Sequence, residues 1–157
     1  MDINFHYLMM ISNAMFNREV VTELQKYGLT PGQPKVLDYL FDHDGAMQKE
    51  IALKTFTDVA TLTGILTKME EKGLIERKTK DGNRRSLYIY LTEKGWEKAK
   101  NVKQTFIEKE EKALNGITPS EREEFLKTTE KICGNLINME EFKKWAVKKK
   151  PNGILYF

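Results

Sequence analysis

The chain has 157 residues and a formal net charge of +3, and 31% of its residues are charged. This length fits one compact domain, or one compact domain with long helical extensions. The longest purely apolar run near the start, residues 7–11, is far too short to cross a bilayer, and Met1 and Asp2 do not resemble the basic start of a signal peptide. We therefore expect a cytoplasmic protein with no membrane partner.

Reactive and metal-binding side chains give no sign of an enzyme. The single cysteine, Cys133, cannot form an internal disulfide, and the two histidines, His6 and His43, do not form a zinc signature. The sequence has no glycine-rich phosphate loop, no nucleophile with a histidine base, and no paired carboxylates outside ordinary charged helix faces. We predict no catalytic residues, no cofactor and no metal, and we interpret Cys133 as a packed thiol rather than a redox sensor.

Residues 3–27 are predicted to form a helix that ends at Gly28. Its apolar residues are more numerous than one narrow stripe needs, and they are Ile3, Phe5, Leu8, Met9, Ile11, Met15, Phe16, Val20 and Leu24. A helix this apolar requires more than one partner surface. The residues around His6 and Tyr7 fit the core of a dimer better than the alternative of a ligand pocket.

A second helix is predicted from Pro31 to about Asp42, with Thr30 as its cap and Gln33 completing a capping box. Two short helices follow. In the first, Ile51, Ala52 and Phe56 are expected to point inward. The next helix is capped by Asp58, stops at Gly73 and buries Leu62, Ile65, Leu66 and Met69. Only the segment TFTD joins them, which predicts a helix-turn-helix.

After Gly73 the apolar period changes from helical to alternating. The segments LIERKT and RSLYIYL are rich in β-branched and aromatic residues, and Asp81, Gly82 and Asn83 supply a turn between them. This pattern predicts a β-hairpin. Between Lys72 and Arg85 there are six basic and two acidic residues, an excess larger than the charge of the whole chain. Cations so concentrated repel each other unless a partner such as the DNA phosphates compensates them.

The C-terminal part is predicted to contain two long helices. Thr92 caps the first, with Trp96, Ala99, Val102, Phe106 and Leu114 inward; Thr118, Pro119 and Glu121 start the second, which we expect to run to about Lys149. A basic cluster near the end of the chain, which includes Lys148 to Lys150, is interpreted as a solvated surface.

Helices followed by a basic hairpin and further long helices give the order of a winged helix-turn-helix. The predicted fold is mainly α with a small β-hairpin. The segments LTPGQPKVL, KEIA, TLTGILTKMEEKGLIERK and DGNRRSLYIYLTEKG resemble the multiple-antibiotic-resistance-regulator (MarR) family of bacterial and archaeal transcription factors, and the resemblance covers residues 29–95. Their order and spacing together are specific, although no single motif is.

The resemblance implies a homodimer that binds double-stranded DNA. Residues 1–28 would form an N-terminal dimerisation helix, residues 29–92 the winged helix-turn-helix, and residues 93–157 the C-terminal dimerisation helices and tail. The family also implies a repressor with a pseudo-palindromic operator and a small aromatic or amphipathic effector, whose binding residues the sequence does not identify. An activator, a ligand-independent architectural factor and a module that docks proteins remain as alternatives.

By position, the helix after Asp58 would be the recognition helix. The residues implied to contact DNA are Gln48, Lys49, Ala60, Thr61, Thr63, Gly64, Lys68, Lys78, Lys80, Arg84 and Arg85. Asp81 would hold one wing arginine in place by a charge-assisted pair. The alternative is that the threonines form only the polar face of an ordinary helix. Family members often have arginine at the position of Gly64 and an acid at that of Asn83, so sequence recognition by this chain is expected to depend on the wing and on DNA shape.

Overall fold

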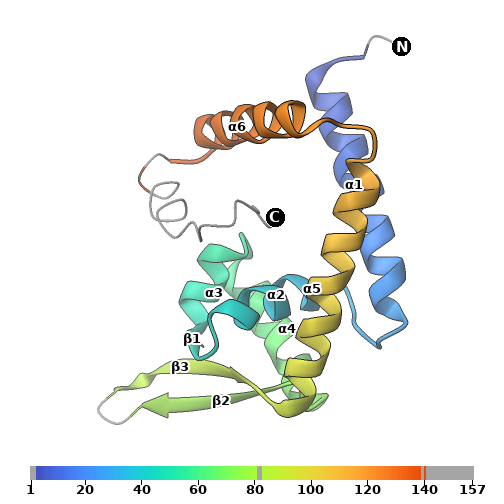
Figure 1. The fold of residues 1–157 in the computed structure, drawn as a ribbon. Coiled ribbons are helices and arrows are strands. Elements are labelled where there is room, and N and C mark those ends of the chain that lie inside the picture. The colour runs from blue at the N-terminus through green and yellow to red at the C-terminus, as the bar shows by residue number, and fades with distance from the viewer. Residues whose placement is uncertain (1–2, 81–82, 139, 141–157) are drawn as a thin grey trace. The chain divides into compact units, whose positions relative to one another are not determined.

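The computed structural model describes residues 3–80, 83–138 and 140, and for residues 80 and 83–86 it describes only the backbone (Figure 1). The chain divides into two units, Met1–Ala113 and Leu114–Phe157, which we treat separately. The first unit contains α1 (Phe5–Gln25), α2 (Gln33–Asp42), β1 (Ala46–Met47), α3 (Gln48–Lys54), α4 (Val59–Glu71), β2 (Ile75–Lys80), β3 (Asn83–Leu91) and α5 (Glu93–Ala113). The second contains α6 (Pro119–Leu136).

The core of the first unit lies where the predicted apolar stripes meet. Its fully buried side chains come from α1, α2, α3, α4, β3 and α5, and the largest are Leu24, Leu37, Leu40, Ile51, Leu62, Leu66, Met69 and Ile89. Each such side chain contributes about 1.5–3 kcal/mol by leaving water. This burial fixes α4 by its inner face, so its outer face remains available.

The three strands form one antiparallel sheet in the order β1-β3-β2. Strand β3 is central, because Ala46 pairs with Ile89 on one side and Arg77 pairs with Ile89 on the other. The paired part of β2 and β3 continues to Lys80 and Asn83, beyond the two residues of β1. Figure 1 shows this hairpin extending away from the helices of the first unit. The predicted hairpin is confirmed, and Asn83 begins β3 instead of lying in the turn.

The hairpin is attached to α5 by a tight junction around Thr92. The Thr92 hydroxyl donates to the carbonyl oxygen of Gly73 at 2.6 Å and accepts from the amide of Gly95 at 3.0 Å, which caps α5 as predicted. A Cβ atom on Gly95 would collide with the carbonyl oxygen of Leu74. The root of the hairpin is therefore fixed against the first turn of α5.

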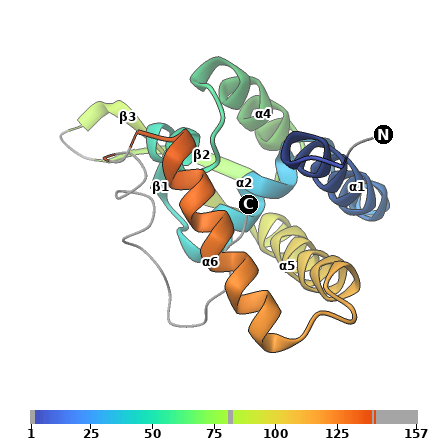
Figure 2. The same ribbon diagram turned by 90° about the horizontal axis from the view of Figure 1, so that it is seen from above.

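Helices α1 and α5 lie side by side in both views (Figures 1 and 2). Lys109 and Lys112 of α5 form ion pairs with Glu19 of α1, at 3.6 and 2.8 Å. Only Val20 and Leu24 of α1 are buried, whereas its N-terminal half exposes the apolar residues Phe5, Leu8, Met9, Met10 and Met15. The predicted excess of apolar surface on this helix is thus present in the single chain.

Three further details of the predicted elements are wrong. Helix α2 begins at Gln33, after Gly32 in a left-handed conformation, so Thr30 is not its cap. Half of the expected capping box does form, because the Thr30 amide donates to Oε1 of Gln33 at 3.0 Å. Phe56 does not point inward; it is 58% exposed and has a φ of +48°.

The third correction concerns the last helix. Helix α6 starts with the predicted capping box of Thr118 and Glu121, but it ends at Leu136, since Ile137 is extended. Farther on, the side chain of Asn138 accepts the amide of Glu140, which is again helical, at 3.1 Å. The predicted helical part beyond residue 140 lies outside the described residues.

Candidate nucleic-acid interface

Helix α4 begins at a well-formed N-cap. The carboxylate of Asp58 accepts the amide of Thr61 at 2.9 Å, as the sequence predicts. The Thr61 hydroxyl also hydrogen-bonds this carboxylate; these two bonds lower the pKa of Asp58. The cap satisfies an otherwise unpaired amide and fixes the direction in which α4 starts.

The predicted recognition residues of α4 all lie on its exposed side. Ala60, Thr61, Thr63, Gly64 and Lys68 are exposed, opposite the buried stripe. The structure therefore brings these five residues together on one accessible face. It also leaves open space around Gly64, where an added Cβ would meet no atom within 4 Å.

Helix α3 adds two of the predicted residues next to this face. Nε2 of Gln48 donates to the Thr63 hydroxyl at 2.8 Å, and this bond joins the start of α3 to the first half of α4. Lys49, the next residue, is exposed. Gln48 thus lies at the α4 face and also positions one of its threonines.

The hydroxyl groups of Thr63 and Thr67 point along the helix. Thr63 donates to the carbonyl oxygen of Val59 at 2.7 Å, and Thr67 donates to that of Thr63 at 3.0 Å. Such bonds from a threonine to the carbonyl four residues earlier are a local option of this side chain. Since a hydroxyl has one proton, neither residue has a donor left for a partner.

Two of the basic residues in the charge-rich segment support the fold. Arg77 of β2 lies against α4, where it donates to the Thr67 hydroxyl at 3.1 Å and its Nε is 3.4 Å from Oε2 of Glu70. Nζ of Lys72 donates to the carbonyl oxygen of Gly28 at 2.8 Å. No sequence pattern predicts these contacts, because Lys72 and Gly28 are 44 residues apart and Arg77 reaches from a strand to a helix.

The remaining basic residues belong to the hairpin. Lys78 is exposed, and Nζ is 2.6 Å from Oε1 of Glu76; hydrogen bonding to that carboxylate raises the pKa of Lys78. Lys80, Arg84 and Arg85 are on the paired strands, but their side chains lie outside the described part of the structure. Asp81 lies entirely outside it, so its predicted pairing with an arginine is untested.

The sequence did not predict the apolar side chains exposed around the turn between α3 and α4. Leu53, Phe56 and Val59 are 44%, 58% and 57% exposed. Phe56 has left-handed backbone geometry, which is unusual for an aromatic residue and costs about 1–2 kcal/mol. No sequence pattern predicts this conformation for a phenylalanine. An apolar residue at the first position of α4, Val59, can be read directly from the sequence.

An ion-pair cluster joins α2 to α5. Nζ of Lys103 is 3.1 Å from a carboxylate oxygen of Asp38 and 3.1 Å from one of Asp42. Burial raises the pKa of the Asp38 carboxyl, although Lys103 opposes this shift. The charges of the two acids in turn raise the pKa of Lys103 against its own desolvation.

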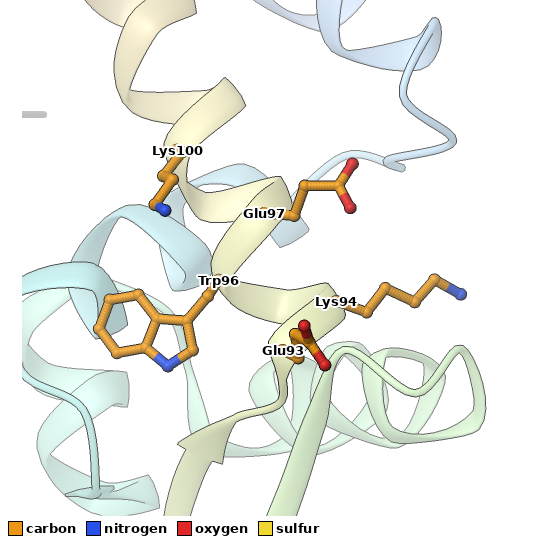
Figure 3. Close-up of a pocket in the computed structure, with 5 residues that line it drawn as sticks. All are labelled: Glu93, Lys94, Trp96, Glu97 and Lys100. Atoms are coloured by element: carbon orange, nitrogen blue, oxygen red, sulfur yellow. The ribbon is translucent and has the colours of Figure 1, made fainter.

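A surface hollow of about 490 Å³ lies at the start of α5 and is lined by Glu93, Lys94, Trp96, Glu97 and Lys100 (Figure 3). The close-up shows Trp96 and Lys100 on one side of the helix and Lys94 and Glu97 on the other, so their charged groups diverge. The indole of Trp96 packs edge-on against Phe41, with ring centroids 5.7 Å apart. This arrangement is not that of a ligand pocket.

Among residues 3–80, 83–138 and 140, no group of three or more His, Cys, Asp or Glu side chains is placed to hold a metal ion. In the same part of the chain, no helix is long and apolar enough to span a membrane.

A short sheet extending from a helix-turn-helix, with an exposed recognition face, defines the winged-helix class of DNA-binding proteins. Comparisons with known proteins identify the group within this class. Residues 29–87 match the model of the MarR family. The chain is 30% identical over 117 residues to the HTH-type transcriptional regulator SarZ of Staphylococcus aureus, a match that covers 74% of this chain and 76% of SarZ.

Two further matches agree. The organic hydroperoxide resistance transcriptional regulator of Bacillus subtilis is 33% identical over 89 residues, which span 57% of this chain and 60% of that protein. The crystal structure of Staphylococcus aureus MepR in complex with DNA is similar with a TM-score of 0.78 and 26% identity, over 87% of this chain and all of MepR. The chain belongs to the MarR family, and it is a DNA-binding transcriptional regulator.

Proposed function

We propose that the protein is a repressor that binds a pseudo-palindromic operator as a homodimer. Residues 29–92 of each subunit would contact one half-site. Helix α4 enters the major groove, with Ala60, Thr61, Thr63, Gly64 and Lys68 toward the bases. The α3 residues Gln48 and Lys49 hold the backbone beside it.

The observation that carries this proposal is the exposed outer face of α4. Its inner side chains, including Leu62 and Leu66, are fully buried, so the outer face is presented rigidly. The hairpin starts immediately after α4, and its basic residues Lys78, Lys80, Arg84 and Arg85 would contact phosphates or the minor groove. Asp81 would position one of the two arginines.

Dimerisation is supported by the apolar surface that the single chain leaves in water. In α1, Phe5 and Met10 are more than half exposed, and in α6 so are Phe125 and Leu136. Exposed apolar surface of this extent on long helices marks an interface. We assign residues 1–28 and 93–157 to it. Light scattering on the purified chain should give the mass of two chains at micromolar concentration; a monomer mass would contradict this assignment.

The protein would respond to a small aromatic or amphipathic effector. A ligand changes DNA affinity only if it binds better to the dimer whose recognition helices are wrongly spaced for successive major grooves, about 34 Å apart. We also propose that the protein is not an enzyme and that it acts in the cytoplasm. Its proposed partner, operator DNA, is found there, and the sequence has no motif of an active site.

The decisive experiment is selection of bound duplexes from a random pool. An inverted repeat with half-sites one helical turn apart is the expected product. Recovery of no preferred sequence, with affinity lost at physiological salt, would instead favour a winged-helix module that docks proteins. Placing the selected site in a reporter promoter then separates repression from activation.

A further inference from the structure

The outer face of α4 is unusually poor in groups that can hydrogen-bond a base edge. Val59, Ala60, Thr61, Thr63 and Gly64 make up its N-terminal half, and all are exposed. Arginine, asparagine and glutamine, which make two hydrogen bonds to a guanine or an adenine, are absent from these five positions. The threonine hydroxyls are the only polar side-chain groups among them.

The single proton of each hydroxyl is already used within the protein, so each hydroxyl can only accept. Thr61 hydrogen-bonds the Asp58 carboxylate, and Thr63 donates to the Val59 carbonyl oxygen at 2.7 Å while it accepts from Gln48 at 2.8 Å. A hydroxyl has only one proton to donate. Donation to a base would therefore break an existing bond, whereas apolar contact of the threonine methyl groups requires no proton.

Thr61 and Thr63 lie toward opposite edges of the exposed face, about 160° apart around the helix, with few obstacles between them. At about 100° per residue, Ala60 and Gly64 lie between Thr61 and Thr63 on the helix surface. Ala60 adds only a methyl group, and Gly64 adds none. Glycine within a helix costs about 1 kcal/mol relative to alanine, and the packing around Gly64 offers no compensating reason for it. The absence of a side chain there lets a base pair approach the helix closely.

In the major groove, thymine is the base with a methyl group, at C5. We propose that α4 recognises thymine in each half-site through apolar contact of its C5-methyl groups with the methyl groups of Thr61 and Thr63 and the side chain of Val59. The inference rests on the proposed placement of α4 in the major groove. It predicts half-sites whose essential positions are T·A pairs.

The test replaces thymine with deoxyuridine, which lacks only the C5-methyl group. In the duplex selected above, each contacted thymine so replaced should weaken binding about fourfold, as expected for one methyl group that stays in water. Deoxyuridine in the spacer between half-sites is the control and should leave affinity unchanged. Equal weakening by the spacer substitutions would indicate an effect on DNA shape and would overturn the inference.

Exchange of the base pair isolates the methyl group further. Replacement of a contacted T·A pair by C·G should weaken binding, and 5-methylcytosine in place of that cytosine should restore part of the loss. The hydrogen-bonding groups of the base are the same in these two duplexes. Identical affinity for both would overturn the proposed contact.

Matched protein variants assign the contact to the threonines. The double variant Thr61→Ser and Thr63→Ser keeps both hydroxyls and removes both methyl groups, so its preference for thymine over deoxyuridine should fall toward one. The Thr61→Val and Thr63→Val double variant keeps the methyl groups and should retain the preference. The opposite pattern would assign recognition to the hydroxyls.

Failure of this inference differs from failure of the proposed function. Equal binding to thymine and deoxyuridine duplexes would leave operator binding intact and overturn only the methyl contact. A protein that binds neither duplex above random DNA would overturn both.

Discussion

Helix α4 and the β2–β3 hairpin flank the same candidate interface, yet their side chains differ in kind. The N-terminal half of the exposed face of α4 is made of small groups, and the Thr63 hydroxyl on it donates within the protein. The hairpin contains Lys78, Lys80, Arg84 and Arg85. Charged contacts to phosphate give affinity that depends on salt and not on sequence, whereas contacts to base edges give specificity.

The difference suggests that affinity and specificity are divided between the two elements. The packing supports this, because the residue that links them most directly, Arg77, is used to hold β2 against α4. Because Arg77 is engaged in these contacts, its charge is not counted among those that contact DNA. If the division is correct, changes in the hairpin and changes in α4 should have separable effects.

The largest expected effect comes from removal of the hairpin charges. The Arg84→Ala and Arg85→Ala double variant removes four charges from a dimer, and the slope of log affinity against log salt should fall by up to about four units. At 0.15 M salt this corresponds to a loss of about a thousandfold in affinity. Fluorescence anisotropy over a salt series measures both quantities.

The control for this variant removes the same charge elsewhere. Lys26 and Lys127 are exposed and pair with Glu23 and Glu123, so the Lys26→Ala and Lys127→Ala double variant should change the slope little; because both lie in the segments assigned to the dimer interface, light scattering must first show that this variant is still a dimer. The preference for thymine over deoxyuridine should be unaltered in the arginine variant. Unchanged affinity after loss of both arginines would mean that the hairpin does not contact DNA.

The next effect concerns the root of the hairpin. Gly95→Ala would place a Cβ atom against the carbonyl oxygen of Leu74, a backbone group that cannot move without disturbing the start of β2. We expect a loss of about 3 kcal/mol in the free energy of unfolding, measured by urea denaturation. Gly116→Ala is a useful comparison, because the space there is open but φ is +83°, so only backbone strain opposes it. A smaller loss for Gly95→Ala than for Gly116→Ala would show that the collision is relieved cheaply.

The ion pairs of Lys103 test whether the interface depends on α5. Lys103→Met removes the partner of the largely buried Asp38 carboxylate, which should cost about 2 kcal/mol in the free energy of unfolding. The same variant should weaken operator binding without changing the preference for thymine, because it affects the frame and not the α4 face. Unchanged thermal stability would mean that the pairs contribute nothing.

The pH dependence of the same cluster has a definite sign. Burial raises the pKa of Asp38 in the folded state, so the folded protein holds this proton more tightly than the unfolded chain. Its contribution is fully present below the ordinary carboxyl pKa and is lost as the pH rises through the raised value. Relative to Asp38→Asn, the wild-type protein should therefore lose stability as the pH rises through this window. A gain over that range would assign the dominant role to the charge of Lys103.

The elements that the sequence predicted well are those with local causes. Asp58 and Thr118 cap the helices that follow them because the amides they accept are three residues away. The winged helix-turn-helix was predicted from such capping signals and from the spacing of apolar residues along the chain. The contact of Lys72 with Gly28 joins residues 44 apart in sequence, and that of Arg77 with Thr67 joins a strand to a helix. Nothing local marks them, so both residues were counted with the DNA-facing charge.

Two other elements had weak local signals. Strand β1 has only two residues, and it exists because Ala46 and Met47 pair with a β3 that the rest of the fold supplies. Helix α6 ends at Leu136, before the extended Ile137, and no glycine or proline follows it up to Glu140 to mark this end. The site residues on α4 were found by position, but the state of their hydroxyls required coordinates, because a threonine can bond either to its own helix or to a partner.

The smallest expected effect comes from substitution of Phe56, which lies in the turn before α4 and not in the hairpin. Its φ of +48° is a conformation that glycine adopts without the Cβ penalty, so Phe56→Gly should relieve strain of about 1 kcal/mol and raise the midpoint of urea denaturation slightly. Phe56→Ala is the matched control, since it removes the ring and keeps the strain. If both variants lower stability equally, contacts of the ring outweigh the backbone cost. A different result is that Phe56→Gly is stabilising but weakens operator binding as much as Phe56→Ala does. This result would mean that the strained turn holds the ring where it contacts DNA. The apolar recognition surface would then extend from α4 into the turn.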